Sequence, residues 1–600
     1  KAPPPTPQPP PLGRTRKEGG APQAWRRRPA AAQPKMAGRM LWIRSEAFDH
    51  GTFNTSVRWT VPKVMEFLGS FRAAVASVTI VRTVWVEVST TRCKPALTEA
   101  EAMAYWHIFV VLQQSILTSS EESNGGFGMI SCWKNRRGSR SPSAAVVAPA
   151  DISLDVRIIG LLLMCQVFSP QRVRTDQFAK SGEMWPGLER ASAGVSSPRH
   201  SPRGASPRIA LPGVAGGQAS VNHRRDISSA MLAFAKQHLG YFLQVVCLAL
   251  TVEPQSVSQE EFDVLGLLLC AGTSPGQPLR RLSEAIPELC QKKSMPMKEL
   301  WRAAEKLLVW NEEVYTSADH HVQEPIDPAG GQTVNITGMS KATWFQRPAS
   351  ADVDYLNITS CDECTIYVTS KVSFCLIAGC RDCTLIMSAV SGMCTIHNCE
   401  KISVHVSAHS FKMENSIDSS AYLFCHVPPI LTGDTRGIKL APFNVLYSQM
   451  SSILQSAKMN LDPEFVDVWS HPICCTLGAP DETLGSRGGR SGHLDGPNHS
   501  TYHFVHPSTF QPVVVPETGP RAVRARDGRP QLVLPQVYDD ALKGHEEEME
   551  ALQRIMADAG DDAKSRRAQQ AIQGHFREWL QSTGKARQLA DLAKMSQQDK

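Results

Sequence analysis

The stretches CDECTIYV (361–368), CRDCTLIM (380–387) and CEKISVHV (399–406) are three copies of one pattern, and each copy begins 19 residues after the one before it. A fourth stretch, IDSSAYLF, begins at Ile417, one residue earlier than this period requires. Self-similarity at a fixed period indicates a protein built from stacked structural repeats. The region from about residue 350 to 445 therefore decides the fold of this part of the chain.

Apolar and polar residues alternate inside each copy, which predicts a β-strand with one buried face. The expected inward positions are Cys364, Ile366 and Val368; Cys383, Leu385 and Met387; Ile402, Val404 and Val406; and Ser420, Tyr422 and Phe424. A second ladder is expected to stack in two columns, namely Leu356, Cys375, Cys394 and Met413, and Ile358, Ile377 and Ile396.

Nineteen residues are enough for one coil of three short strands and their corners, so that equivalent residues stack about 4.8 Å apart with parallel pairing between coils. We therefore predict a short parallel β-helix of roughly five coils, stabilised by contacts between neighbouring repeats.

The cysteines of the repeat also allow a second interpretation. Cys361, Cys364, Cys380 and Cys383 have the spacing C-x2-C-x15-C-x2-C, which is typical of a four-thiolate zinc site. In the next copy, however, Ile402 stands at the position of Cys383, and isoleucine cannot bind a metal but can replace a small buried thiol. We favour the structural ladder and predict neither a metal nor a cofactor. Stoichiometric metal in the purified protein would support the zinc site instead.

Composition and hydrophobic periodicity divide the 600 residues into several regions, as a chain of this length leads one to expect. Residues 1–37 are rich in Pro, Ala and Arg, and we expect them to be disordered. The other expected regions are an α/β segment (41–117), a low-complexity linker or insert interrupted by an apolar island (118–226), an α-helical region (227–312), the β-helix (333–476), a loop-rich segment with flexible inserts (477–534) and a C-terminal helical hairpin (535–592).

The predicted hairpin depends on two apolar stripes with helical spacing. They include Val537, Leu542 and Met549 in the first helix and Ile572, Phe576 and Trp579 in the second. Gly560 lies between the stripes and is expected to end the first helix. An antiparallel pair of helices is the simplest arrangement that follows.

Charge and hydropathy exclude some classes of function. The chain has 63 Lys and Arg against 57 Asp and Glu, and this net charge of +6 is too small to indicate a dedicated nucleic-acid binder. The apolar runs Ile158–Phe168 and Tyr241–Val252 are shorter than the roughly 18 to 20 residues that span a bilayer. Sixteen cysteines without a secretory signal pattern suit a reducing compartment. We expect a cytoplasmic protein without a membrane span.

The repeat, which closes in GIKLAPF (437–443), resembles the C-CAP/cofactor C-like domain family of tubulin-folding cofactor C, the retinitis pigmentosa 2 protein and the cyclase-associated proteins. The stretches LWIRSEAF from Leu41, VWSHPICC (468–475) and HFREWLQSTGKARQL (575–589) resemble the flanks of a further member of this family. The resemblance implies a right-handed parallel β-helix within a multidomain α+β protein, with an α-helical N-terminal region and a C-terminal helical hairpin.

The resemblance also points to one position on the β-helix. Cofactor C and the retinitis pigmentosa 2 protein activate GTPases by supplying an Arg, from a stretch resembling Q-Q-F-R, to the nucleotide site of tubulin or a small G protein. Such an arginine finger accelerates phosphoryl transfer by about 10³ to 10⁵. Here the matching stretch runs from His409 to Lys412, with Phe411 kept and Lys412 at the Arg position. Lysine lacks the bidentate fork of arginine, so we predict no catalytic residue and expect Lys412 to be a solvated surface residue.

The resemblance therefore implies a non-enzymatic interaction protein of the cytoskeleton. The member with similar flanks also lacks the Arg and is associated with centrosomes, basal bodies or spindle poles and with organelle positioning. Expected partners are tubulin, small G proteins or centrosomal proteins, and not nucleic acid. The alternative is a residual GTPase activator that uses Lys412 or a nearby cation such as Arg436.

Overall fold

The computed structural model describes the chain in separate ranges. They are residues 40–124, 152–168, 215–250, 254–272, 282–286, 292–308, 322–323, 333–346, 352–476, 501–516, 532–558, 562–582, 586, 588–590 and 593. The disorder expected for residues 1–37 lies outside the described residues.

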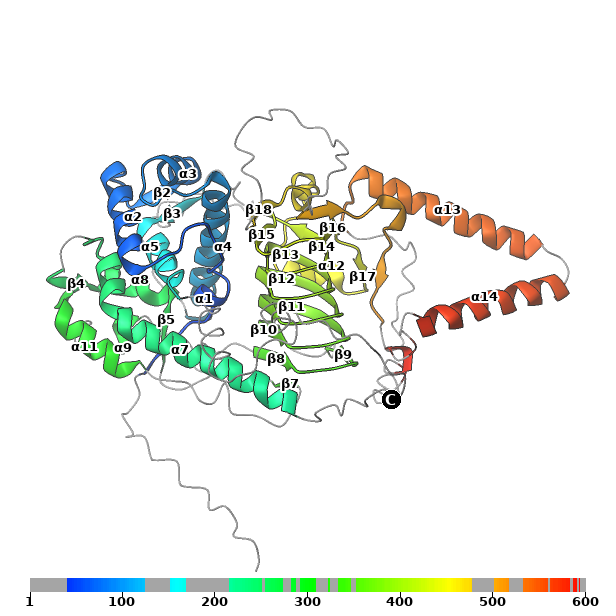
Figure 1. Cartoon of the computed structure of the whole chain (residues 1–600), viewed down its shortest axis with the longest axis horizontal. Helices are drawn as coiled ribbons and strands as arrows, with labels where there is room; N and C mark the ends of the chain where they lie inside the picture. Colours follow the sequence, from blue (N-terminus) through cyan, green and yellow to red (C-terminus); the bar gives the residue numbers. More distant parts are fainter. Residues whose placement is uncertain are drawn as a thin grey trace, which may run out of the picture. The chain divides into compact units, whose positions relative to one another are not determined.

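The described residues between 40 and 308 form a helical domain around one hydrophobic core (Figure 1). Its helices are α1 (Glu46–Asp49), α2 (Val61–Ala74), α3 (Arg82–Thr91), α4 (Glu99–Asn124), α5 (Val156–Cys165), α7 (Ala215–Val246), α8 (Gln259–Val264), α9 (Leu282–Ala285) and α11 (Met297–Leu307). Three antiparallel pairs of short strands accompany them, namely β1 (Met40–Ile43) with β5 (Leu269–Gly272), β2 (Thr79–Val81) with β3 (Ser153–Asp155), and β4 (Ser256–Ser258) with β6 (Ser294–Pro296).

Local capping signals begin two of these helices. At α5, the carboxylate of Asp155 accepts a hydrogen bond from the backbone N–H of Arg157 at 2.8 Å. At α8, Ser258 and Glu261 form a capping box in which each side chain accepts from the other residue's backbone N–H. Such caps satisfy backbone donors that have no partner within the helix.

Helix α5 lies inside the range that the composition predicts to be a linker (118–226). All its residues except Arg157 are buried in the core, including Gly160, where an added Cβ would lie only 2.5 Å from a methyl group of Val245. Helix α4 also extends into this range, and α7 begins within it. The apolar island that interrupts this range forms α5, so the range is a linker or insert only in part. The same core joins the expected 41–117 and 227–312 regions.

The second body is a parallel β-helix of about six coils, one more than expected (Figure 1). Its parallel strands are β8 (Thr333–Thr337), β9 (Thr343–Phe345), β10 (Val353–Thr359), β11 (Thr365–Ala378), β12 (Thr384–His397), β13 (Ser403–Glu414), β14 (Ser420–Cys425), β15 (Ile430–Gly433), β16 (Ile438–Pro442), β18 (Ile473–Thr476) and β19 (Tyr502–Phe504). Strand β7 (Val322–Gln323) pairs with β8 antiparallel. The β-helix thus continues through β19, inside the segment expected to be loops.

The predicted columns are confirmed through the first coils. Cys375 pairs with both Leu356 and Cys394, and Ile377 pairs with both Ile358 and Ile396. All these side chains are buried in one apolar cluster that fills the β-helix. Thiols and aliphatic side chains therefore stack in register along its axis.

The predicted register is wrong in the coil that follows. Cys394 pairs with Phe411 instead of Met413, and Val404 pairs with Ala421. Tyr422 consequently faces outward, where its ring stacks on His405 with centroids 4.3 Å apart, and Phe424 packs in a different cluster. The cause is a stretch inside β13, between His405 and Ser410, that is two residues shorter than the stretch of β12 beside it, and this makes the coil 17 residues long. Because side chains alternate with a period of two, the assumed 18-residue spacing exchanged the inner and outer faces.

Left-handed backbone at the corners explains the repeated Cys motif. The residue before each first cysteine has positive φ, as at Ser360 (54°), Gly379 (63°) and Asn398 (52°). A second position, occupied by Glu363 and Asp382, also has positive φ near 50°. Gly, Asn and Asp tolerate this conformation best, so the spacing between the cysteines reflects a turn of fixed geometry.

Further elements lie against the later coils. They are α12 (Met450–Ser456), the 3₁₀ turns η4 (Pro463–Phe465), η5 (Val468–Ser470) and η6 (Pro507–Thr509), the parallel pair β17 (Val445–Leu446) and β20 (Val513–Val514), and the first turns of α13 (Gln536–Asp558). Helix α14 (Asp562–Ser582) follows α13, so the two predicted C-terminal helices form. No helix among the described residues is long and apolar enough to cross a membrane.

Candidate functional site

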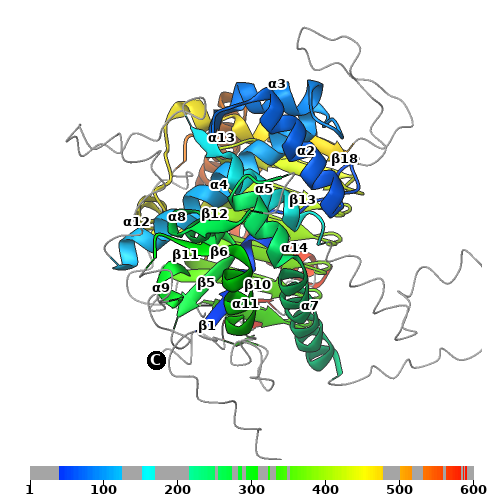
Figure 2. The same ribbon diagram turned by 90° about the vertical axis from the view of Figure 1, so that its left-hand side faces the viewer.

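The helical domain covers the β-helix face that carries position 412. Figure 2, viewed from the helical domain, shows α4 in front of the strands of the β-helix. Phe374, Met393 and Ile430 of the β-helix belong to the apolar core of the helical domain. The approach is close, because a Cβ added to Gly392 would lie 3.1 Å from Oγ of Ser115 in α4.

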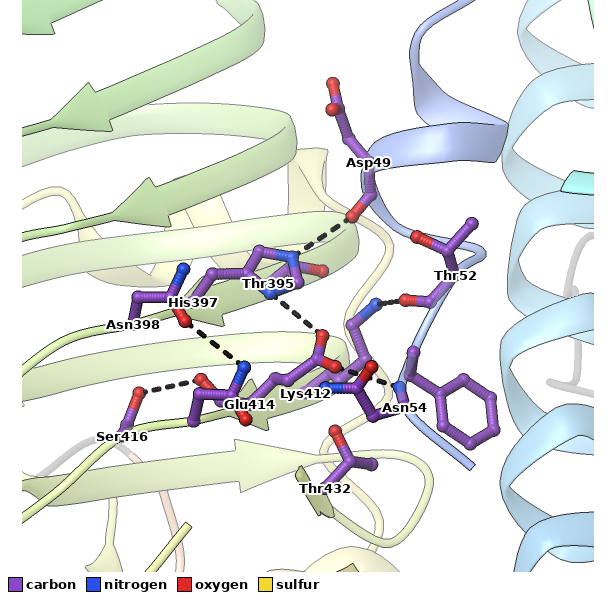
Figure 3. A network of polar contacts seen from close by, with 12 residues as sticks. Asp49, Thr52, Asn54, Thr395, His397, Asn398, Lys412, Glu414, Ser416 and Thr432 are labelled. Carbon is purple, nitrogen blue, oxygen red and sulfur yellow. Dashed lines mark hydrogen bonds and ion pairs between the residues drawn. The ribbon is translucent and has the colours of Figure 1, made fainter. Parts of the chain in front are cut away.

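The polar part of this contact lies where residues 49–54, from the last residue of α1 into the loop before α2, meet strands β12 and β13 (Figure 3). Alternation along these strands places Thr395, His397, Lys412 and Glu414 on the outer face, while Phe411 points inward and fills the core. We call these four outer residues the polar ladder.

Lys412 is completely buried at the centre of the polar ladder. Its Nζ donates hydrogen bonds to the backbone carbonyl oxygens of His50 at 2.7 Å and Thr52 at 2.6 Å. Burial lowers the pKa of Lys412 to about 8, although the nearby carboxylates of Glu414 and Asp49 act in the opposite direction. The expectation that Lys412 is a solvated residue is therefore wrong, because residues 49–54 cover it.

Glu414 holds the neighbouring backbone. Its Oε1 accepts a hydrogen bond from the backbone N–H of Asn54 at 2.8 Å, and its Oε2 lies 3.0 Å from Nδ1 of His397. Burial alone would raise the pKa of Glu414, but the hydrogen bond and charge of His397, with Lys412 and the Asn54 N–H, keep this pKa below its ordinary value. The carboxylate is thus a charged acceptor inside the contact.

The side chain of His50, from the helical domain, contacts side chains of the β-helix. Its Nδ1 lies 2.8 Å from the hydroxyl oxygen of Thr395, and its ring packs against Phe374 with centroids 5.1 Å apart. A further contact joins the ring of His397 to the carbonyl oxygen of Asp49, with Nε2 and O separated by 3.4 Å. Most of the polar ladder therefore contacts backbone atoms of residues 49–54.

A second polar contact involves β10, two coils before β12. The hydroxyl of Tyr355 donates a hydrogen bond to Oε1 of Glu46 in α1, and the same oxygen lies 3.3 Å from Nη1 of Arg44. Arg44 and Glu46 are both buried. Removing one partner of a buried ionic contact strongly destabilises a protein, so this contact also fixes the helical domain on the β-helix.

The other cation expected near the site lies elsewhere. Arg436 is at a corner of the β-helix, where its side chain is 51% exposed and lies 3.6 Å from the carboxylate of Asp434. The structure therefore separates Arg436 from Lys412, which is buried on the covered face. Sequence reasoning missed Thr395, His397 and Glu414. Outward polar residues two apart on adjacent strands were the available signal, but the shifted register obscured it.

The four cysteines of the zinc interpretation lie along one corner of the β-helix. The thiol of Cys364 donates to the carbonyl oxygen of Asp362 at 3.2 Å, and that of Cys383 donates to Arg381 at 3.1 Å. In the shorter coil Ser419 makes the equivalent contact with Ile417 at 2.9 Å. Among the residues that the structure describes, no group of three or more His, Cys, Asp or Glu side chains is arranged to hold a metal ion.

Comparison with known sequences identifies the repeat region. The family model described as "Tubulin binding cofactor C" matches residues 353–472, so the chain carries a domain of this kind. TBCC domain-containing protein 1 of Danio rerio is 23% identical over 266 residues, which cover 44% of this chain and 42% of that protein. The match thus spans less than half the length of this curated relative.

A solved structure gives a partial match. Tubulin Binding Cofactor C from Leishmania major matches with 17% sequence identity, 22% coverage of this chain, 87% coverage of that chain and a TM-score of 0.16.

Proposed function

We propose that this chain is a non-enzymatic interaction protein that organises the cytoskeleton at the centrosome or basal body and contributes to organelle positioning. Two findings support a cytoskeletal role: the tubulin binding cofactor C domain and the similarity to TBCC domain-containing protein 1. Tubulin, small G proteins or centrosomal proteins are the proposed partners, and the cytoplasm and cytoskeleton are the proposed location.

The burial of Lys412 is the observation that favours a non-enzymatic role. An arginine finger must reach the phosphates of a nucleotide held by another protein, and it acts through a planar cation with several donors. Lys412 has neither property, because its Nζ is occupied by the carbonyl oxygens of His50 and Thr52 and its side chain has no exposed surface. The face that serves catalysis in some relatives instead holds a domain of the same chain.

Single-turnover GTP hydrolysis tests this proposal. Tubulin and a panel of small G proteins are loaded with GTP, and hydrolysis is followed with and without the full chain. We expect no stimulation. As a matched control, Lys439 is a lysine on the exposed side of β16, so Lys439→Ala and Lys412→Ala are compared. Stimulation that Lys412→Ala abolishes and Lys439→Ala retains would contradict the proposal and favour the GTPase activator.

Localisation tests the cytoskeletal part separately. A fluorescently tagged full chain is expected to coincide with a centrosome marker and to recover tubulin or centrosomal proteins in affinity capture. The tagged Lys439→Ala chain, which changes an exposed lysine of β16, is the control and should locate in the same way. A diffuse distribution of the unmodified chain, with no cytoskeletal protein captured, would contradict the role.

A further inference from the structure

Helix α14 exposes a stripe of large apolar side chains. Ile572 and Phe576 are 50% and 52% exposed, and Trp579 stacks on Phe576 with ring centroids 5.9 Å apart and planes 17° apart. These residues follow the spacing of one helical face. A cluster of exposed apolar residues bordered by polar ones marks a site of interaction.

Helix α13 has an apolar face that the β-helix covers only in part. Tyr538 and Leu542 are buried in the apolar cluster of the β-helix, and the hydroxyl of Tyr538 donates to the carbonyl oxygen of Val505 at 2.7 Å. Met549 lies two turns further on the same helical face, but it is 55% exposed. The β-helix therefore anchors the beginning of α13 and leaves Met549 available.

The two helices carry opposite charges. Helix α13 contains seven acidic and two basic residues, whereas α14 contains four basic and two acidic residues. Exposed residues include Glu547 and Glu548 on α13 and Arg567 and Arg577 on α14. Complementary charge favours α13 against α14 and disfavours pairing of two identical helices. The acidic α13 also makes an anionic membrane a poor partner for this pair.

We propose that α13 and α14 form a homodimerisation module, in which α14 of one copy packs on α13 of a second copy. Two-fold symmetry brings both complementary pairs together at once, because each copy supplies one helix of either charge. The four helices can then bury their apolar stripes around a shared core, as helical bundles do. Pairing of only two helices would leave the outer sides of both stripes in water.

Sedimentation velocity of the full chain over a concentration series tests this proposal. We expect a reversible dimer. The double substitution Ile572→Glu and Phe576→Glu should weaken dimerisation by on the order of 100-fold, because it places two charges in the apolar seam. Val514 of β20 is 62% exposed but lies outside the module, so Val514→Glu is the matched control and should dimerise normally. Circular dichroism verifies that the variants are folded.

Charge reversal and cross-linking identify the pairing. Arg567→Glu with Arg577→Glu should weaken the dimer, and adding Glu547→Lys with Glu548→Lys should restore it. Met549→Cys in one tagged copy should cross-link to Ile572→Cys in a differently tagged copy.

A chain that stays monomeric at every concentration, or cross-links only within one copy, would overturn the proposal in favour of an intramolecular hairpin. Binding to anionic lipid vesicles by a monomer would overturn it in favour of a membrane surface. These outcomes are independent of the GTP hydrolysis and localisation results.

Discussion

At the scale of single residues, Lys412 connects two parts of the chain. The ammonium group is buried at a cost in hydration, and this cost is offset by two backbone carbonyl oxygens and by the neighbouring Glu414. A lysine exposed on the surface would be hydrated by water and would not need such hydrogen-bond acceptors. The same position can therefore support domain docking while it loses the exposure that catalysis in another protein requires.

We expect Lys412→Met to lower the free energy of unfolding by about 2–4 kcal/mol, because the carbonyl oxygens of His50 and Thr52 lose their buried donor. Urea unfolding measures the change. Lys439→Met on the exposed side of β16 is the control and should change stability by no more than about 0.5 kcal/mol. Equal effects of the two substitutions would contradict the role assigned to Lys412.

The difference in free energy of unfolding between the unmodified chain and Lys412→Met should change with pH in a defined direction. The pKa of Lys412 is about 8 in the folded chain and 10.5 is its ordinary value, so the unfolded chain binds more protons between these two pH values. The unmodified chain should therefore gain stability relative to Lys412→Met as pH rises from 8 towards 10.5, and this difference should be constant below that window. A difference that falls with rising pH would contradict the assignment.

At the scale of elements, the length of one stretch inside β13 sets which side chains enter the β-helix. The coil from β13 to β14 is two residues shorter than the 19-residue period, and this shortening keeps the alternation of inner and outer faces. Ala421 is consequently inside and Tyr422 outside, although the 18-residue spacing assumed from the sequence predicts the reverse.

Substitution at these neighbours tests the register. Ala421→Asp places a carboxylate in the apolar core and should destabilise the chain by more than about 4 kcal/mol, enough to prevent soluble expression. Tyr422→Asp loses its stacking on His405 but leaves the carboxylate near the surface, so its cost should be about 1–2 kcal/mol. Soluble yield and urea unfolding measure both variants. Greater damage from Tyr422→Asp would support the register predicted from the sequence.

At the scale of the whole molecule, the helical domain and the β-helix share a core and a polar contact, so we expect them to behave as one folded unit. The polar ladder also holds residues 49–54 in place, because its side chains form hydrogen bonds with the backbone of this segment at several points. Loss of these hydrogen bonds should therefore open residues 49–54 locally, while the helical domain stays packed on the β-helix.

Hydrogen exchange distinguishes local opening of residues 49–54 from global unfolding. In Lys412→Met, the backbone amides of Phe53 and Asn54 should exchange at least about 10-fold faster, while those of β12 remain protected. The amide of Phe53 donates to Gln166 and that of Asn54 to Glu414, so both report directly on the segment. Faster exchange throughout β12 would show global unfolding and contradict the local role.

The repeat was predictable because its information is local and recurrent. The alternation around Cys364, the stacking of Cys375 on Cys394 and the parallel pairing all follow from a fixed period, and the structure has them. The later register was not predictable in the same way. The two residues are lost inside β13, between His405 and Ser410, and no local pattern in the sequence marks this loss.

The sequence by itself determined the β-helix, its apolar columns and the replacement of Arg by Lys412, because a repeated pattern must bury the same face in every coil. Only the tertiary structure decided what that lysine does. Its partners are backbone atoms of His50 and Thr52, about 360 residues earlier in the chain. Every residue type presents the same carbonyl oxygen, so no sequence signal identifies such a contact before the chain is folded.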